Sequence, residues 1–300
     1  MSANQSHPLS ARRILPDAKP SRLRCPRATL PLGQRTLVMG ILNITPDSFS
    51  DGGKYLDPAA AVRHALELVR DGADIIDVGG ESTRPAAQDI PEEEEIRRVL
   101  PVIESLAEKA DVPISVDTRK SGVARRAVKA GAQIINDISA LHHDPEMLRV
   151  AAENGTPVVL MHMRGTPATM QQYTTYGDLM REVEDYLLAA VSECINAGLG
   201  YDQVVVDPGI GFAKNAEQNL EILGNLHKLA SLRLPLMVGV SRKSFIGRIL
   251  GLPSEERLEG TAAAVAACVL GGADIVRVHD VREMVRVIKV CDAVRSKMKR

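Results

Sequence analysis

The chain has 300 residues, of which 45% are hydrophobic, and its formal net charge is −1 at pH 7. A charge so close to neutral gives no reason to expect nucleic acid or an anionic membrane as a partner, and the absence of tryptophan argues against a base-stacking surface. No run approaches the roughly 18 continuous apolar residues of a membrane span. The sequence therefore predicts a globular protein with neither a nucleic-acid nor a membrane partner.

The first 22 residues form a polar, basic segment that lacks the continuous apolar core of a secretory signal. We expect residues 1–22 to be a disordered tail and residues 23–300 to fold as one domain. The four cysteines are scattered and none belongs to a CxxC pair: Cys25, Cys194, Cys268 and Cys291. This spacing is typical of reduced thiols rather than of disulfides or a zinc site, so we expect a cytoplasmic protein.

Eight apolar runs rich in β-branched residues recur along the chain, and each is followed by a helix-like stretch. The runs span residues 36–43, 74–81, 113–118, 133–139, 157–162, 203–209, 234–243 and 274–280. Runs that are apolar throughout, rather than alternating, are typical of parallel strands covered by helices on both faces. Eight such units predict an α/β fold, a single (β/α)8 TIM barrel. Residues 27–40 predict a short hairpin that leads into the first strand and closes the barrel floor.

The helical stretches are expected at residues 58–70, 91–110, 121–130, 145–154, 178–197, 216–230, 257–270 and from 281 to the basic C-terminus. Asp57 and Pro58 predict the N-cap and the first residue of the first helix. Four consecutive glutamates, Glu92 to Glu95, open the second helix. We expect them to complement the helix dipole on a solvated face rather than to bind a metal.

Three connections after strands are long enough to be lids or binding loops: residues 44–57, 82–91 and 163–177. The seventh helix, residues 257–270, is apolar nearly all the way round. A helix on the outside of a barrel has no need of a second apolar face unless another subunit covers it. We therefore expect a homodimer formed through the seventh and eighth helices.

Polar residues collect where the predicted strands end, at the rim where such barrels place their chemistry. Carboxylates and an amide, at Asp117, Asn136 and Asp207, suit the mixed donor and acceptor edge of a flat heterocycle such as a 2-amino-4-oxopyrimidine. Lys243 adds a donor for a ring carbonyl or nitrogen. The alternative is that each strand-end Asp or Asn caps the helix that follows it.

A second set of rim residues predicts an anion site. Arg84, Arg277 and His279 are cationic or polar donors, and the helix start near Ser244 offers backbone N–H groups. Asn43 or loop hydroxyls nearby are predicted to bind Mg2+ and so stabilise a departing diphosphate. The alternative is that Arg277 and His279 pair only with neighbours such as Asp280, Arg282 or Glu283.

The sequence contains no GxSxG or HExxH motif, and its DPGIGFAK glycines do not form the dinucleotide-binding pattern. Catalysis by positioning and charge stabilisation is therefore expected, without a covalent intermediate.

Seven motifs occur in an order and spacing that resemble those of the dihydropteroate synthases: MGILNITPDSFSDGG, GGESTRP, VDTRK, INDISA, DPGIGFAK, GVSRKSFIG and VRVHD. The resemblance extends from about Leu37 to about Val290. It implies a transferase of folate biosynthesis that condenses 4-aminobenzoate with 7,8-dihydropterin-6-ylmethyl diphosphate. The products are 7,8-dihydropteroate and diphosphate, Mg2+ is required, and sulfonamides are implied as competitive inhibitors.

The resemblance also assigns roles by position. The pterin is expected to contact Asp117, Asn136, Ile138, Met161, Asp207, Gly211, Phe212, Gly239, Lys243 and Arg277. The 4-aminobenzoate is expected near Thr83, Arg84, Pro85, Phe212, Lys243 and Ser244. Diphosphate is expected at Asn43, Thr83, Arg84, Arg277 and His279, with Asn43 as the metal contact. The catalytic set is Asn43, Arg84, Asp117, Lys243, Arg277 and His279, and the loops 44–57 and 82–91 are expected to close over both substrates.

Two other functions fit part of the pattern. A catalytically silent pterin-binding homologue would bind the ring without reacting it, but damage would be expected among the anion-binding residues, and all of these are present. A folate-dependent methyltransferase would keep the carboxylate and amide set but would need neither the diphosphate cluster nor the NITPDSFSDGG segment.

Overall fold

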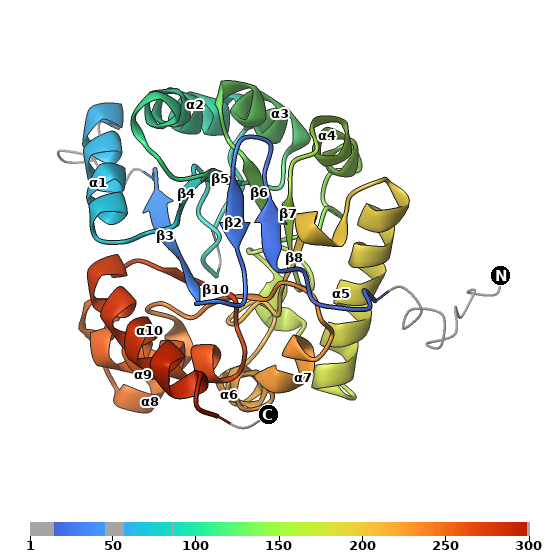
Figure 1. The fold of residues 1–300 in the computed structure, drawn as a ribbon, viewed down its shortest axis with the longest axis vertical. Helices are drawn as coiled ribbons and strands as arrows, with labels where there is room; N and C mark the ends of the chain where they lie inside the picture. The colour runs from blue at the N-terminus through green and yellow to red at the C-terminus, as the bar shows by residue number, and fades with distance from the viewer. Residues whose placement is uncertain (1–14, 46–56, 86, 299–300) are drawn as a thin grey trace.

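The structure, a computed structural model, describes residues 15–45, 57–85 and 87–298. Eight parallel strands form its centre and pair in the order β8–β7–β6–β5–β4–β3–β10–β9. A parallel bridge between Val206 and Leu236 joins β8 to the segment before β9 and closes the sheet into a barrel, as predicted (Figure 1). The strands are β3 (Leu37–Asn43), β4 (Ile75–Gly79), β5 (Ile114–Asp117), β6 (Ile134–Asp137), β7 (Val158–Met161), β8 (Val204–Asp207), β9 (Met237–Gly239) and β10 (Ile275–Val278).

Helices surround the barrel (Figure 1). They are α1 (Pro58–Arg70), α2 (Glu92–Lys109), α3 (Ser121–Ala130), α4 (Met147–Asn154), α5 (Leu179–Asn196), α6 (Ala216–Gly224), α7 (Leu226–Ala230), α8 (Ser244–Leu250), α9 (Leu258–Leu270) and α10 (Val281–Arg295). Short 3-10 turns occur at Met170–Gln172, Tyr201–Gln203 and Ser254–Glu256. None of the helices within the described ranges is long and apolar enough to span a membrane.

The helix starts and breaks follow local chemistry. Asp57 caps α1 as predicted, because its carboxylate accepts the N–H of Ala59 at 2.9 Å. The single helix expected over residues 216–230 is wrong: it divides at Asn225, whose side-chain amide donates to the carbonyl of Glu221 at 2.9 Å. Asparagine commonly makes such local bonds, which compete with helix continuation.

The expectation that Glu92 to Glu95 all lie on a solvated face is also wrong. Glu95 is fully buried and accepts a hydrogen bond from the Lys120 ammonium at 2.6 Å. A buried carboxylate requires such a partner. Helical periodicity explains the placement, since Glu95 falls next to Ile96 and one turn before Val99 on the face of α2 that packs against the barrel.

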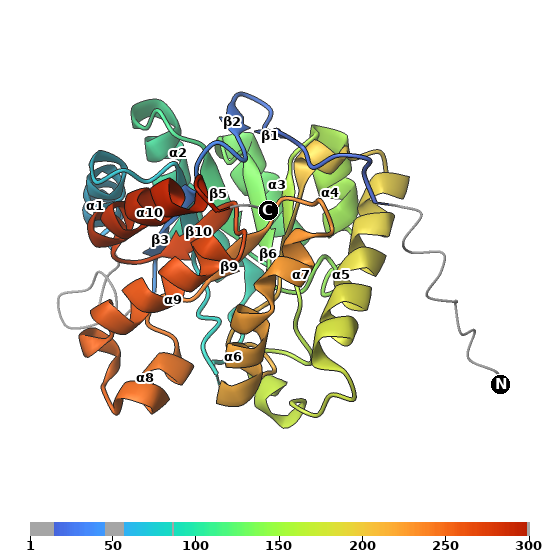
Figure 2. The same cartoon turned by 60° about the horizontal axis from the view of Figure 1, so that its bottom comes forward.

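A two-stranded antiparallel hairpin closes one end of the barrel. It consists of β1 (Arg22–Arg24) and β2 (Thr29–Pro31), so it begins five residues before the predicted hairpin segment. Its buried Leu23 packs with residues near the amino ends of the strands, including Leu37, Ile75, Ile134, Val205 and Ile275. Figure 2 shows this hairpin at the end of the molecule opposite α8. The floor is therefore apolar and sealed.

The predicted tail, residues 1–22, lies largely outside the described part of the chain. Among its last residues, Lys19 forms an ion pair with Asp274 at 2.5 Å. The extent of the tail stays a prediction.

Strand alternation places polar side chains above this apolar floor. In β4, β6 and β10 the floor residues Ile75, Ile134 and Ile275 are each followed two positions later by Asp77, Asn136 and Arg277. The register aligns Asn43 with Gly79, Gly79 with Asp117 and Asp117 with Asn136 across β3 to β6. The same alternation that fills the floor with apolar residues therefore collects polar groups at the opposite rim.

Candidate active site

A buried ionic cluster occupies the rim. Arg277, on β10, donates from Nε to Asp77 Oδ2 at 2.6 Å and from Nη2 to Asp117 Oδ2 at 2.7 Å. Asn136 donates from Nδ2 to the same Asp77 oxygen at 3.0 Å. The alternative in which Arg277 pairs with its sequence neighbours is wrong, because Asp280 instead accepts from Arg242.

Asp77 was not predicted from the sequence. It is fully buried, and its Oδ1 has no hydrogen-bond partner among the described residues. Polar residues at strand ends carry the sequence signal for a rim site, whereas Asp77 lies in the middle of an apolar run. A charged residue inside such a run was the available signal, since aspartate is almost never fully buried unless it is paired.

The cluster changes the protonation of its carboxylates. Burial raises the pKa of Asp117 to about 7, although the Arg277 guanidinium opposes the shift and the nearby Asp77 adds to it. Burial likewise raises the pKa of Asp207, while the N–H of Gly209 opposes the change. A carboxyl with a pKa near 7, such as that of Asp117, can accept hydrogen bonds from a heterocycle when ionised and donate one when protonated.

The turn after β8 places Lys243 next to a ring. Asp207 Oδ1 accepts the Gly209 N–H at 2.7 Å, and Lys243 Nζ donates to the carbonyl of Ile210 at 2.5 Å. The same ammonium lies 4.4 Å from the centroid of the Phe212 ring, within the range of a cation–π contact. Burial lowers the pKa of Lys243 to about 8, with Asp207 acting in the opposite direction.

Lys214 supports this turn from inside and was also missed. Its ammonium is buried and donates to the carbonyls of Gly209 at 3.1 Å and Phe212 at 2.9 Å. It also lies 2.9 Å from Nδ1 of His162, whose pKa burial and the Lys214 charge lower to about 2. The segment that carries Gly211 and Phe212 is therefore fixed by side chains below it.

Apolar side chains form one wall of the rim. Ile138 and Met161, both predicted to contact the pterin, form a buried cluster with Met163, Met170 and Ala213, and Phe212 packs against it. Gly239 lies beside Arg277 in the register of β9 and β10. Residues from separate segments of the sequence thus bring an apolar cluster and a polar cluster together at the rim, a combination that ligand sites usually have.

His279 is held on the other side of Arg277. Its Nδ1 lies 3.0 Å from Ser241 Oγ, and the same hydroxyl accepts the His279 backbone N–H at 3.2 Å. The serine hydroxyl can accept from the backbone and still either donate to Nδ1 or accept from it, so the bond orients the imidazole ring whichever nitrogen carries the proton. Burial, followed by the charges of Arg277 and Arg242, lowers the His279 pKa to about 4, and Arg84 contributes in the same direction.

The remaining predicted residues surround this cluster. A Cβ placed on Gly79 would lie 3.5 Å from Asp117 Cβ and 3.8 Å from Asn43 Oδ1, so the Asn43 amide and Asp117 flank the same glycine. Thr83 is half-buried, whereas Arg84, Pro85 and Ser244 are exposed. Most of the predicted lid 44–57 lies outside the described residues. The described residues contain no set of three or more His, Cys, Asp or Glu side chains that could hold a metal.

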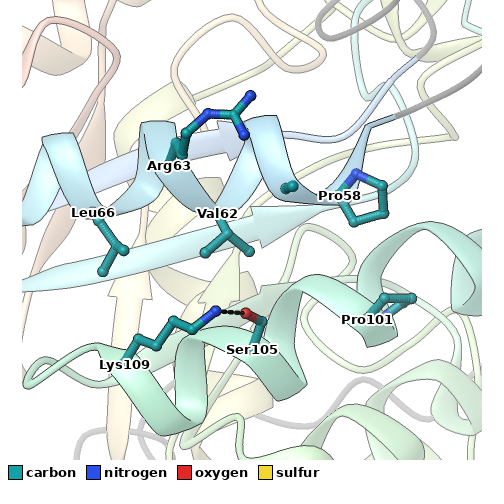
Figure 3. A pocket seen from close by; sticks show the side chains of 8 residues that line it. Pro58, Val62, Arg63, Leu66, Pro101, Ser105 and Lys109 are labelled. Atoms are coloured by element: carbon teal, nitrogen blue, oxygen red, sulfur yellow. Dashed lines mark hydrogen bonds between the residues drawn. The ribbon is translucent and has the colours of Figure 1, made fainter.

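Figure 3 shows a different hollow, of about 350 Å3, between α1 and α2 on the outer helix layer. Pro58, Val62, Leu66 and Pro101 give it apolar sides, and its Lys109 ammonium is already bonded to Ser105 Oγ at 2.9 Å. Because its polar lining side chains already have partners, Lys109 with Ser105 and Arg63 with Asp57, we do not assign a substrate to it.

Comparison with known proteins agrees with this geometry. Residues 39–279 match the family described as pterin binding enzymes. A dihydropteroate synthase of Synechocystis is 51% identical over 262 residues, which cover 87% of this chain and 91% of the relative. The dihydropteroate synthase of Yersinia pestis in complex with a sulfonamide drug has a TM-score of 0.87 at 44% identity, covering 92% of this chain and 99% of that one. The Xanthomonas albilineans enzyme with 4-aminobenzoic acid has a TM-score of 0.86 at 43% identity, covering 93% and 99%.

The fold and the rim thus define a pterin-binding enzyme built on a (β/α)8 barrel. Within that class, the chain belongs to the dihydropteroate synthase family. The resemblance drawn from the seven motifs is confirmed, as is the prediction of a transferase of a pterinylmethyl group.

Proposed function

We propose that the chain condenses 4-aminobenzoate with 7,8-dihydropterin-6-ylmethyl diphosphate at this rim, with the residues in the roles predicted from the sequence. The proposal rests above all on one observation. Arg277 on β10 donates to Asp117 at the end of β5 at 2.7 Å and pairs in register with Gly239 on β9, while Lys243, after β9, donates to the carbonyl of Ile210 in the turn that also bonds Asp207. These groups therefore face one site rather than separate cavities.

The pterin is assigned to the side of the rim with the carboxylates. Asp117, Asn136 and Asp207 supply acceptors and an amide donor for the edge of the ring, and Lys243 supplies a cationic donor. The cluster of Ile138, Met161 and Phe212 provides an apolar face on which a flat ring packs. Gly211 and Gly239 line the slot without side chains, and Arg277 stacks near the ring.

The diphosphate is assigned to the side with Arg277 and His279. The methylene carbon of the pterin forms its new bond to the amine nitrogen of 4-aminobenzoate while the C–O bond to diphosphate breaks with its electron pair, and the amine loses a proton. An aromatic amine is already neutral at pH 7, so departure of the anion is the harder part. Donors from Thr83, Arg84, Arg277 and His279 stabilise that departing charge.

Asn43 is the residue we assign to Mg2+. Its amide oxygen is a hard ligand at the rim, in line with Asp117 across the sheet. Mg2+ commonly binds through one or two protein oxygens together with substrate phosphates, so a site that has few protein ligands fits a metal delivered with diphosphate. When bound, the ion would neutralise charge on the leaving group.

The second substrate is assigned to Thr83, Arg84, Pro85, Phe212, Lys243 and Ser244. These residues come from the loop after β4, the turn after β8 and the start of α8. The relative from Xanthomonas albilineans was solved with 4-aminobenzoic acid and that from Yersinia pestis with a sulfonamide, which supports competitive inhibition of this chain by sulfonamides at the same place.

We also propose that the chain is a cytoplasmic homodimer. All four cysteines are buried and none forms a disulfide, which fits a reducing compartment. Among the described residues, most exposed large apolar side chains lie on or near α8, α9 and α10, including Ile249, Leu270, Val290 and Val294. Such a concentration on packed neighbouring helices marks a surface that another subunit covers.

The decisive experiment measures diphosphate release with each substrate and Mg2+ omitted in turn. Release that depends jointly on 4-aminobenzoate and Mg2+ supports the proposal. Pterin binding without release would instead support the silent homologue, and binding of methyltetrahydrofolate without any Mg2+ dependence would support the methyltransferase.

A further inference from the structure

The loop that carries Thr83, Arg84 and Pro85 is closed at its base, where its two ends are bonded to each other. We call this base the neck. It leaves the barrel after Glu81 and returns through Ile90 to α2. Glu81 is buried, and its Oε1 accepts the backbone N–H of Ile90 at 2.8 Å. One carboxylate at the exit of the loop therefore holds the backbone at its return.

Arg119 crosses the same neck from the next strand. Its buried Nη2 donates to Glu81 Oε2 at 3.0 Å and to Asp89 Oδ1 at 2.9 Å. The side chain of Arg119 is 3% exposed, whereas that of Asp89 is 54% exposed. The guanidinium thus reaches out from the interior to the exposed return of the loop.

A second cation supports the arrangement from below. Lys120 Nζ lies 3.2 Å from Glu81 Oε1 and 2.6 Å from Oε2 of the buried Glu95 on α2. The exit of the loop, its return and the first turn of the following helix are therefore held by two adjacent cations after β5. Because buried ion pairs add little net stability, the main consequence of this cluster is geometric.

The neck is connected directly to the pterin side of the rim. Arg119 lies two residues after Asp117, and the sheet continues between them, since the Thr118 N–H donates to the carbonyl of Asn136 at 3.0 Å. The arginine is thus anchored on the same rigid strand end as a pterin-binding carboxylate. Any shift of that strand end relative to the loop is restricted by the bonds of Arg119.

We propose that Arg119, acting through Glu81 and Asp89, is a positioning residue that places Thr83, Arg84 and Pro85 over the second substrate. This inference rests on the roles proposed above for those three residues. The neck fixes where the loop starts and ends, so it determines where the loop's middle meets 4-aminobenzoate. It touches neither substrate itself.

The test compares steady-state kinetics of Arg119→Met with those of Arg84→Ala. Since small misplacements of contacting groups have large kinetic effects, Arg119→Met is expected to raise the KM for 4-aminobenzoate on the order of tenfold. The KM for the pterin diphosphate should rise by a clearly smaller factor, because its ring contacts lie on other segments and only its diphosphate is assigned to Thr83 and Arg84. Arg35→Met is the matched control. It removes an arginine–aspartate pair with Asp74 at the opposite end of β4 and should leave both KM values unchanged.

Asp89→Asn is a second variant, which keeps the test decisive if Arg119→Met does not fold. The residue is exposed, so the variant should fold and raise the same KM by a smaller factor, with no further effect when combined with Arg119→Met. Equal increases in both KM values, or an unchanged KM for 4-aminobenzoate, would overturn the inference.

If the substrate role proposed for the loop is wrong, the kinetics will show it separately from the role of Arg119. If Arg84→Ala kept full activity, the substrate role of the loop would be wrong whatever Arg119 does. The neck is then tested by hydrogen exchange at the Ile90 amide, which should be faster in Arg119→Met than in Arg35→Met. Equal exchange in the two variants would refute the neck itself.

Discussion

At the residue scale, each charged side chain of the site depends on very few hydrogen-bond partners. Arg277 depends on Asp77 and Asp117, and the Asp77 carboxylate also accepts from Asn136. Asp117, Asn136 and Arg277 are assigned to the pterin, and Asp77 bonds two of them. A change in one partner should therefore be felt both in stability and in ligand binding.

Asp77→Asn should destabilise the protein and weaken pterin binding. The amide is of similar size but leaves the buried guanidinium with a single carboxylate, which should cost about 1–3 kcal/mol in the free energy of unfolding. Arg277 should then be drawn more strongly to Asp117, which competes with the ring for that carboxylate. Denaturant unfolding and calorimetric titration with a pterin measure the two effects. Asp280→Asn, which disturbs the more exposed pair with Arg242, should have the smaller effect on both, and equal effects would contradict the assigned role of Asp77.

Lys243 predicts an alkaline limit to activity. Burial lowers its pKa to about 8, so the ammonium is present below that pH and loses its proton as the pH rises through it. We expect kcat/KM for the pterin diphosphate to fall above about pH 8, since this parameter reports ionisation of the free enzyme. In Lys243→Arg the overall rate should be lower, but that alkaline limb should disappear because arginine stays protonated. An unchanged limb would assign it to another group.

At the element scale, turns rather than strands determine the shape of the slot. Gly209 has φ +68°, and a Cβ there would lie 2.1 Å from the carbonyl oxygen of His162. The turn that presents Gly211 and Phe212 therefore requires a glycine both for its backbone conformation and for the space it occupies.

Gly209→Ala separates these two requirements when it is compared with Gly251→Ala. Gly251 has nearly the same φ, +70°, but a Cβ there would meet nothing within 4 Å. The control should lose about 1–2 kcal/mol from the left-handed conformation alone. Gly209→Ala should lose a further ~1–3 kcal/mol from overpacking and should impair binding of both substrates, since Phe212 moves with the turn. Thermal unfolding and KM values provide the check, and equal losses in the two variants would show that the contact with His162 is unimportant.

The elements also explain what sequence reading can and cannot predict. The strands, nearly all helix positions and the carboxylates at the strand ends were predictable because each produces a local pattern in the sequence. Asp77 was missed because its role depends on Arg277, which lies 200 residues further along the chain, and Lys214 because the carbonyls it bonds converge only when the turn is folded. The burial of Glu95 was missed because the cation that compensates it, Lys120, lies on another strand–helix unit 25 residues away.

At the scale of the whole molecule, seven of the nine exposed large apolar side chains in the described ranges lie on α8, α9 or α10 or just after α10. Most of the seven motifs follow strands and face the rim, whereas α9 and α10 pack together on the outside and have no assigned part in the chemistry. Val290 and Val294 on α10 are 65% and 51% exposed, and Leu258 and Leu270 mark the two ends of α9. Burial of each such side chain against a partner stabilises an assembly by roughly 1.5–3 kcal/mol.

Val290→Glu combined with Val294→Glu should therefore convert a dimer into monomers. Two carboxylates would lose hydration if a second copy packed there, and like charges would face one another across a two-fold axis. The apparent mass from light scattering at micromolar concentration should fall by half, while the unfolding midpoint of the monomer should change little, since both side chains are exposed. Leu220→Glu on α6 is the control, because it places a charge at an exposed apolar residue away from α9 and α10. If the wild-type chain is already monomeric, or if Leu220→Glu lowers the apparent mass equally, then α9 and α10, the seventh and eighth predicted helices, do not form the interface.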